Sequence, residues 1–196
     1  MSTVTTEQVK ALREKTSLSI MQCKKALEEA DGDIEKAIVI LQKQSGAVAD
    51  KKSDRTLGAG TVASYIHQGG TVGSIVELSC ETDFVAKNAE FQTLAYDLAM
   101  HVAASDPLFL KMDDIDADAR KVAEEVFIEE TKGKPEELKA KILEGKLKSY
   151  FGEKTLLEQV FIKNQDMIIK DLISGYVQKF GERIEVRRFI RFSTKS

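Results

Sequence analysis

The chain has 196 residues, of which 42% are hydrophobic and 31% charged, with a net charge of −3. This balance predicts a globular protein of one or two domains, and the acidic charge disfavours generic nucleic-acid binding, which needs a basic surface. The N-terminus carries no basic region followed by an apolar block, and no apolar run approaches the roughly 20 residues that cross a bilayer. We therefore expect a cytoplasmic protein without membrane contact.

Residues 5–43 predict three short helices. Thr5 begins the first with a capping-box pattern, Ser17 or Ser19 opens the second, and Asp33 caps the third. The second helix carries a core stripe at helical spacing, made of Ile20, Cys23, Leu27 and Ala30.

Helical periodicity is lost after residue 44, where Gly, Ser, Lys and Asp dominate. We therefore predict a three-helix domain at 1–44, a linker at 45–57 and a core domain at 58–196. The core is predicted to be α+β, with an antiparallel three-stranded sheet packed against helices.

Three segments with strand character supply that sheet. Thr61–His67 and Val72–Cys80 alternate, and Gly69-Gly70 between them suits a tight hairpin turn. Glu182–Ser193 is the third strand, with one apolar face made of Ile184, Val186, Ile190 and Phe192. The three arginines of this strand suit either a phosphate site or ion pairs, and the ion pairs are favoured: Arg187, Arg188 and Arg191.

The helices of the core differ in how apolar they are. Residues 90–105 carry a continuous stripe and should cover the sheet, with His101 beside it as a structural residue. Segments 116–131 and 136–149 are strongly charged, which predicts a protruding helical hairpin at about 116–150. Its thin apolar stripes are Val122 and Val126 against Leu138, Ile142 and Leu147, and its turn is Lys132 to Pro135. An extended segment at 156–162 and a helix at 166–179 follow.

A large aromatic residue lies at the corner between the second strand and the long helix. Thr82 or Asp83 can cap the helix that follows, which places Phe84 in or near its first turn. The ring either folds back on its own sheet as a core residue or is held outward as an anchor for another protein. Local pattern alone does not decide between these alternatives.

No catalytic or metal-binding constellation emerges from the sequence. Cys23 and Cys80 lie in apolar patterns and are predicted to be buried, reduced thiols rather than a disulfide. A thiol triad of Cys80, His67 and Asp83 lacks an activating feature, and two histidines are too few for a metal site. We expect a binding protein with no cofactor, no metal and no enzymatic chemistry of its own.

Several blocks, in order, resemble the bacterial elongation factor Ts family, whose members remove GDP from elongation factor Tu. The blocks are Val9–Thr16, Met21–Leu27, Ser64–His67, Thr82–Asn88 and Met100–Ser105, and they span nearly the whole chain. The resemblance implies a guanine nucleotide exchange factor that binds elongation factor Tu in its GDP-bound and nucleotide-free states.

The resemblance also implies roles for particular residues. The family's exchange corner matches Thr82, Asp83, Phe84 and Val85, which would displace Mg²⁺ from elongation factor Tu. Candidate partner-binding residues are Arg13, Ile20, Met21, Lys24 and His67. Met21 and His67 each have a plainer interpretation, as a lone exposed methionine and a polar residue at the end of a hairpin.

At the level of domains, the resemblance implies a ubiquitin-associated-like fold for the N-terminal helices. The loop at Thr16–Ser19 lacks the Met-Gly-Phe or Met-Gly-Tyr pattern of ubiquitin binders. The chain carries its sheet-and-helix core once, like the short members of the family, which pair two chains. We therefore predict a homodimer, with a ribosomal RNA binder and a thiol enzyme as rival classes.

Overall fold

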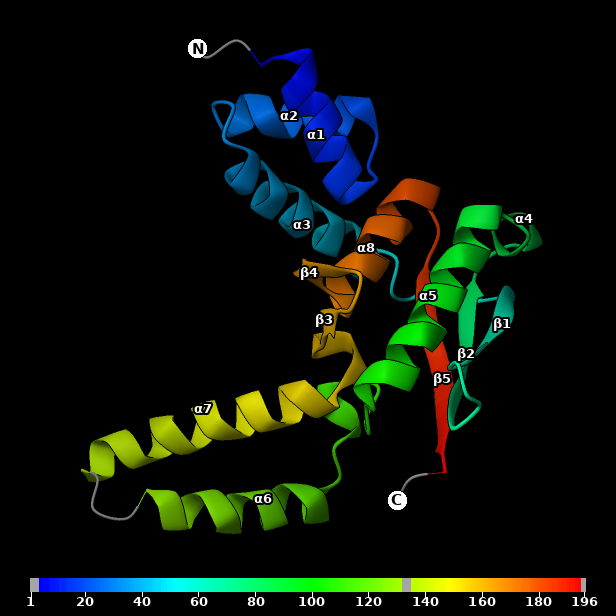
Figure 1. The fold of residues 1–196 in the computed structure, drawn as a ribbon. Helices are drawn as coiled ribbons and strands as arrows, with labels where there is room; N and C mark the ends of the chain where they lie inside the picture. Colours follow the sequence, from blue (N-terminus) through cyan, green and yellow to red (C-terminus); the bar gives the residue numbers. More distant parts are fainter. Residues whose placement is uncertain (1–3, 132–134, 195–196) are drawn as a thin grey trace. The chain divides into compact units, whose positions relative to one another are not determined.

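The computed structural model describes residues 4–131 and 135–194 (Figure 1). Within them, eight α-helices accompany an antiparallel sheet of order β1-β2-β5 and a two-stranded sheet of β3 and β4. The predicted α+β class and three-stranded sheet are confirmed. The chain divides into two compact units. The first holds the chain up to Ala63, Val76–Asp97 and Lys170–Arg187; the second holds Ser64–Ile75, Leu98–Ile169 and the chain from Arg188.

The first three helices form as their capping residues predict. They are α1 (Thr6–Thr16), α2 (Ile20–Glu29) and α3 (Ile34–Asp50). Thr5 and Ser19 each complete a capping box, and Asp33 accepts a hydrogen bond from the Lys36 amide. The three helices enclose a small aliphatic core made of Leu12, Leu18, Cys23, Ala26, Leu27, Ala30, Ala37, Ile38 and Leu41.

The predicted core stripe of α2 is wrong at its first position. Ile20 is 57% exposed, whereas Leu18, which precedes the Ser19 cap, is buried. Leu18 lies one residue before the cap and Cys23 at the fourth helical position, which is the spacing of a hydrophobic staple. Leu18, in the loop before α2, therefore occupies the core position that we expected Ile20 to fill.

The linker expected from residue 45 is helical as far as Asp50, so that expectation is wrong over its first six residues. Contacts with residues distant in the sequence account for the longer helix. The buried Ser45 hydroxyl donates to the Gln178 side chain, and Lys52 Nζ donates to the Gly181 carbonyl at 2.8 Å. These contacts with α8 (Ile169–Phe180) and the glycine after it support the helix through Gly46 despite the weak helix propensity of glycine. A separate N-terminal domain stays a prediction.

The sheet is built from β1 (Ala59–Ile66), β2 (Val72–Cys80) and β5 (Ile184–Ser193). Gly69 and Gly70 have φ values of +98° and +69°, which confirms the predicted glycine turn. These three strands lie side by side in Figure 1.

The helix α5 (Ala89–Ser105) covers one face of this sheet. In the second unit, the Ser74 hydroxyl donates to the Ala99 carbonyl at 2.5 Å, and Arg191 Nε donates to the Ala103 carbonyl at 2.9 Å. The predicted stripe is buried throughout and comprises Phe91, Leu94, Ala95, Leu98 and Val102.

The single apolar face predicted for β5 is only half buried. Ile184 and Val186 are buried, but Ile190 and Phe192 are 48% and 61% exposed. In the second half of the strand, Arg191 donates to the Ala103 carbonyl of α5, so its neighbours Ile190 and Phe192 point away from that helix. The apolar residues expected in the core therefore lie on the outer face.

Two long helices of the second unit pack together, α6 (Ala117–Glu130) and α7 (Glu136–Lys154) (Figure 1). The predicted α6 stripe is wrong, because Val122 and Val126 are exposed. The pairing instead uses aromatic residues, in a cluster of Ala123, Leu147 and Phe151 with Phe109, Met112, Ile115, Phe127 and Leu143. Helix α7 also runs five residues beyond its expected end. Lys132, Gly133 and Lys134 of the predicted turn lie outside the described residues, and the protruding arrangement stays a prediction.

Short elements connect the helices of the second unit. They are η1 (Met112–Asp114), η2 (Leu156–Glu158), β3 (Val160–Phe161) and β4 (Asn164–Ile168). The β3–β4 pair corrects the expected helix start, because residues 166–168 belong to a strand and α8 begins at Ile169. Among the described helices, we find none with the length and apolar character needed to cross a bilayer.

Candidate functional site

The corner after β2 is a separate helical turn, α4 (Asp83–Ala86), and not the start of α5. Thr82 is its N-cap, with an extended backbone, and its hydroxyl accepts a hydrogen bond from the Val85 amide at 3.5 Å. The chain then turns at Lys87 and Asn88, and the Asn88 side chain accepts from the Glu90 amide at 2.8 Å. Hydrogen bonds therefore fix the corner on both sides of the turn.

Phe84 is 82% exposed, whereas the next residue, Val85, is only 2% exposed. Ala86 is also buried, so the turn is anchored in the protein by the two residues that follow the ring. The alternative in which Phe84 packs on its own sheet is wrong. Thr82 and Asp83 are exposed beside the ring, and Asp83 pairs with Lys87 at 3.7 Å.

A residue that sequence reasoning missed holds this corner. Glu182 lies a hundred positions along the chain, in the turn between α8 and β5. Its Oε2 accepts hydrogen bonds from the amides of Glu81 (3.1 Å) and Thr82 (3.0 Å), and its Oε1 accepts one from the Thr82 hydroxyl (2.6 Å). No sequence motif links these positions, so only the fold reveals the contact.

The candidate residues of the N-terminal helices gather on α1 and α2. Ile20 and Met21 are 57% and 75% exposed at the start of α2. Arg13 is exposed on α1, and Lys24 is exposed with its ammonium 3.8 Å from Glu28. Two adjacent apolar side chains exposed to water on one helix are suited to contact with a partner.

His67 lies at the end of β1, in the hairpin turn. Its amide donates to the Val72 carbonyl at 2.8 Å, and its Nδ1 lies 3.2 Å from the Tyr65 hydroxyl. The imidazole is exposed, so it is available to a partner.

The cysteines behave as predicted, as free and buried thiols. Burial, followed by the negative charge of Glu182, raises the pKa of the Cys80 thiol to about 11. A thiol with this pKa is almost wholly protonated at neutral pH and is a poor nucleophile. Within 4–131 and 135–194, no cluster of His, Cys, Asp and Glu suits a metal ion.

His101 is a fully buried member of a hydrogen-bond network, which confirms its structural assignment. Its Nδ1 accepts from the Ile162 amide at 3.4 Å, so Nε2 carries the proton and donates to Gln159 Oε1 at 2.9 Å. Burial lowers the pKa of the imidazole, and the Gln159 hydrogen bond opposes part of that shift.

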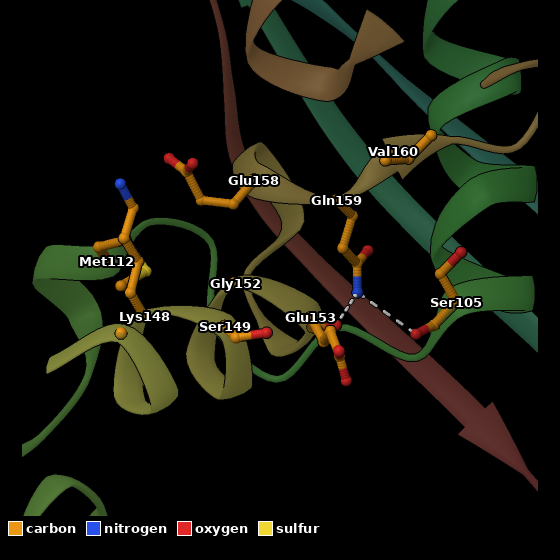
Figure 2. A pocket seen from close by; sticks show the side chains of 10 residues that line it. Ser105, Met112, Lys148, Ser149, Gly152, Glu153, Glu158, Gln159 and Val160 are labelled. Atoms are coloured by element: carbon orange, nitrogen blue, oxygen red, sulfur yellow. Dashed lines mark hydrogen bonds between the residues drawn. The ribbon is translucent and has the colours of Figure 1, made fainter. Parts of the chain in front are cut away.

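A cavity of about 890 Å³ lies beside the same network, in the second unit. Figure 2 shows α7 residues along one side and the η2–β3 segment along another. Gln159 lines it, but its amide donates to the Glu153 carbonyl at 2.7 Å and the Ser105 carbonyl at 3.4 Å. The polar group in the wall is therefore satisfied by the chain itself.

The outer face of the sheet carries a row of exposed apolar side chains. Hydrogen bonds from the His67 amide to the Val72 carbonyl and from Thr194 to Thr71 set the register of the three strands. Extended along regular antiparallel strands, these hydrogen bonds would pair Ile75 with Ile190 and place Gly73 between Ile66 and Phe192. A β-carbon at Gly73 would lie 2.5 Å from Ile66 Cδ1, so the Ile66 side chain lies over the glycine. We call Ile66, Gly73, Ile75, Ile190 and Phe192 the open sheet face.

Comparison with known proteins agrees with the family resemblance of the whole chain. The family described as Elongation factor TS matches residues 3–195. Elongation factor Ts of Koribacter versatilis is 47% identical over 96% of this chain and 87% of its own length. The protein of that name from Gloeobacter violaceus is 47% identical over 98% and 89%, and that from Thermodesulfovibrio yellowstonii is 48% identical over 96% and 95%. Because the family match covers nearly the whole length of the chain, this chain belongs to the elongation factor Ts family.

Proposed function

We propose that the chain is a guanine nucleotide exchange factor for elongation factor Tu, acting in the cytoplasm, where translation takes place. It binds the GDP complex, promotes release of GDP and stabilises the nucleotide-free state until GTP binds. The reaction requires no covalent chemistry. The observation that carries the proposal is the exposed Phe84 ring on a hydrogen-bonded turn, in a chain of this family.

Exchange follows from linkage between two binding events. A partner that holds GDP through a phosphate loop and Mg²⁺ needs tight geometry at both. A factor that binds the nucleotide-free form better must weaken GDP binding by the same ratio by which GDP weakens its own binding. Several contacts must act together, because one coupling of about 1–3 kcal/mol changes affinity only about 5–150-fold.

We assign the displacement of Mg²⁺ to the corner formed by Thr82, Asp83, Phe84 and Val85. Phe84 enters the partner next to the region that holds the ion, with the Asp83 carboxylate beside it. Burial of one phenylalanine stabilises a complex by about 1.5–3 kcal/mol, which anchors a wedge but does not hold two proteins together. Val85 is buried in its own chain, so its part is to hold the turn.

The N-terminal helices supply a second contact with the partner. Ile20 and Met21 are the apolar centre of this surface, and Arg13 and Lys24 are its charged surroundings. His67 is proposed to contact a partner from the hairpin turn. Binding through these residues would bring the Phe84 corner to the nucleotide site.

The open sheet face supports a homodimer. Isoleucines at positions 66, 75 and 190 and Phe192 leave apolar side chains exposed on this face, and exposed apolar patches mark protein interfaces. A second copy presents the same surface, so a two-fold interface would cover both at once. Each dimer would then carry two Phe84 corners and bind two molecules of elongation factor Tu.

The direct test measures release of fluorescent GDP from elongation factor Tu, with and without this chain. We expect release to be accelerated at catalytic concentrations of the chain. Removing Mg²⁺ with EDTA should accelerate release alone and leave the chain little further effect. Unchanged release with the chain present would overturn exchange activity, and a full additional acceleration in EDTA would overturn the displacement of Mg²⁺.

A further inference from the structure

The loop that carries the Phe84 corner has a carboxylate beneath it from a distant part of the chain. Gly181, with φ of +72°, ends α8 and turns the chain so that Glu182 reaches the corner. One carboxylate oxygen accepts two consecutive backbone amides, and the other accepts the Thr82 hydroxyl. Hydrogen bonds to an ionised acceptor are about twice as strong as neutral ones.

The neighbouring residues make the reciprocal contact. The Glu81 carboxylate accepts the Arg183 amide at 2.5 Å and the Arg55 guanidinium at 3.3 Å and 3.4 Å. The Arg183 hydrogen bond, together with Arg55, lowers the pKa of Glu81. Segments 81–82 and 182–183 are therefore joined in both directions. The glutamate carboxylate of each segment accepts hydrogen bonds from backbone amides of the other.

The Glu182 contact determines how Thr82 caps α4. The Thr82 hydroxyl donates its only hydrogen bond to Glu182. The lone pairs of the hydroxyl oxygen therefore remain available to accept a hydrogen bond from the Val85 amide. That capping hydrogen bond orients a turn of only four residues, which could not hold itself in place. The direction of the exposed ring therefore depends on the carboxylate together with the buried anchors Val85 and Ala86.

We propose that Glu182 is a positioning residue for nucleotide exchange, which holds the Thr82 cap and thereby the Phe84 ring in the orientation that enters the partner. The proposal rests on the exchange function proposed above. A ring fixed before binding loses less conformational freedom in the complex than a ring on a loose loop. Because other contacts are proposed to dock the partner first, the ring is ordered within the docked complex, and loss of the carboxylate should lower the turnover of bound complexes more than it weakens binding.

The test measures exchange at increasing concentrations of the elongation factor Tu–GDP complex for wild type, Glu182→Gln and Glu182→Ala. Alanine should lower kcat about tenfold or more, the effect of losing a charged hydrogen bond, and change KM by less than about twofold. Glutamine keeps one acceptor oxygen and should give an intermediate kcat. Glu124→Gln, which alters a half-buried carboxylate 3.1 Å from Arg120 on α6, is the matched control and should retain both constants.

A double-mutant cycle separates positioning from general destabilisation. Thr82→Val removes the hydroxyl that Glu182 accepts, so adding Glu182→Ala should lower kcat by much less than the product of the two single effects. Multiplicative effects would overturn the proposal. So would a wild-type kcat in both Glu182 variants, or a loss confined to KM. If the alanine variant does not fold, the kcat of the glutamine variant tests the proposal by itself.

Hydrogen exchange of backbone amides gives a readout that does not need elongation factor Tu. The Glu81 and Thr82 amides should be protected in wild type and should exchange faster in Glu182→Ala, with the α5 amides unchanged. Equal protection in both proteins would overturn the contact. If wild type fails to release GDP while these amides respond as expected, the exchange function fails and the hydrogen-bonded corner stands.

Discussion

Phe84 and Val85 are consecutive residues of one helical turn, and their side chains lie in opposite environments: the ring is 82% exposed and the valine 2%. Binding and stability should therefore separate at this dipeptide. Phe84→Ala should change the free energy of unfolding by less than about 0.5 kcal/mol and slow GDP release more than about tenfold.

Val85→Ala should act mainly on stability. It removes buried methyl groups and should therefore cost about 2 kcal/mol of folding free energy. Urea unfolding and fluorescent GDP release measure both quantities in the two variants. Leu108→Ala, another exposed apolar residue, serves as the control and should leave both unchanged. Normal exchange by Phe84→Ala would remove the wedge from the mechanism.

The open sheet face predicts that charge will separate the dimer. Phe192→Glu would place a carboxylate in an apolar two-fold interface, where burying an unpaired charge is strongly unfavourable. Sedimentation velocity at micromolar concentration should give a dimer for wild type and a monomer for this variant. Val122→Glu, at an exposed apolar position of α6, should remain dimeric. A wild-type monomer would contradict the proposed assembly.

His101 predicts a loss of stability in mild acid. Burial lowers its pKa in the folded state, so below about pH 6.5, its usual pKa, the unfolded chain binds the proton more readily. Stability should fall as pH drops through that value, by at most about 1.4 kcal/mol per pH unit, and this contribution should level off below the folded pKa.

Urea unfolding at pH 7.5 and 5.5 measures the effect of His101. In His101→Gln the part of the pH dependence due to this residue should disappear, even if the variant is less stable overall. An equal difference between the two pH values in both proteins would show that other groups cause it.

The glycines predict opposite effects of alanine at two positions. Gly46 lies within α3, and a β-carbon there would have no neighbour within 4 Å, so Gly46→Ala should raise the free energy of unfolding by about 0.5–1 kcal/mol. Gly69→Ala has equal space but a φ of +98°, so it should destabilise. Thermal unfolding midpoints of the two variants compare them directly.

Cys80 predicts chemical inertness in the folded state. Its thiol is buried, with a pKa of about 11, so iodoacetamide should label it extremely slowly at pH 7.5. In urea both cysteines should react, which controls for the reagent. Rapid labelling of the folded chain at Cys80 would revive the thiol-enzyme alternative.

Local chemistry predicted much of this fold from the sequence. The caps at Thr5 and Asp33, the Gly69-Gly70 turn and the α5 stripe each depend on residues within a few positions of one another. The exposed position of Phe84 was one of two alternatives, because burial depends on what the rest of the chain brings to the corner.

The remaining features depend on contacts between distant residues. Helix α3 continues past residue 44 because Ser45 meets Gln178. The outward position of Ile190 follows from Arg191 reaching α5, which alternation alone does not reveal. Glu182 joins Thr82 across a hundred positions, and a lone glutamate before a strand carries no local signal.

The distance along the chain between Thr82 and Glu182 has a consequence for how the protein is made. A ribosome completes the corner long before it adds the glutamate that fixes it. A nascent chain therefore displays the phenylalanine first and gains its rigid setting only after a hundred further residues have been added.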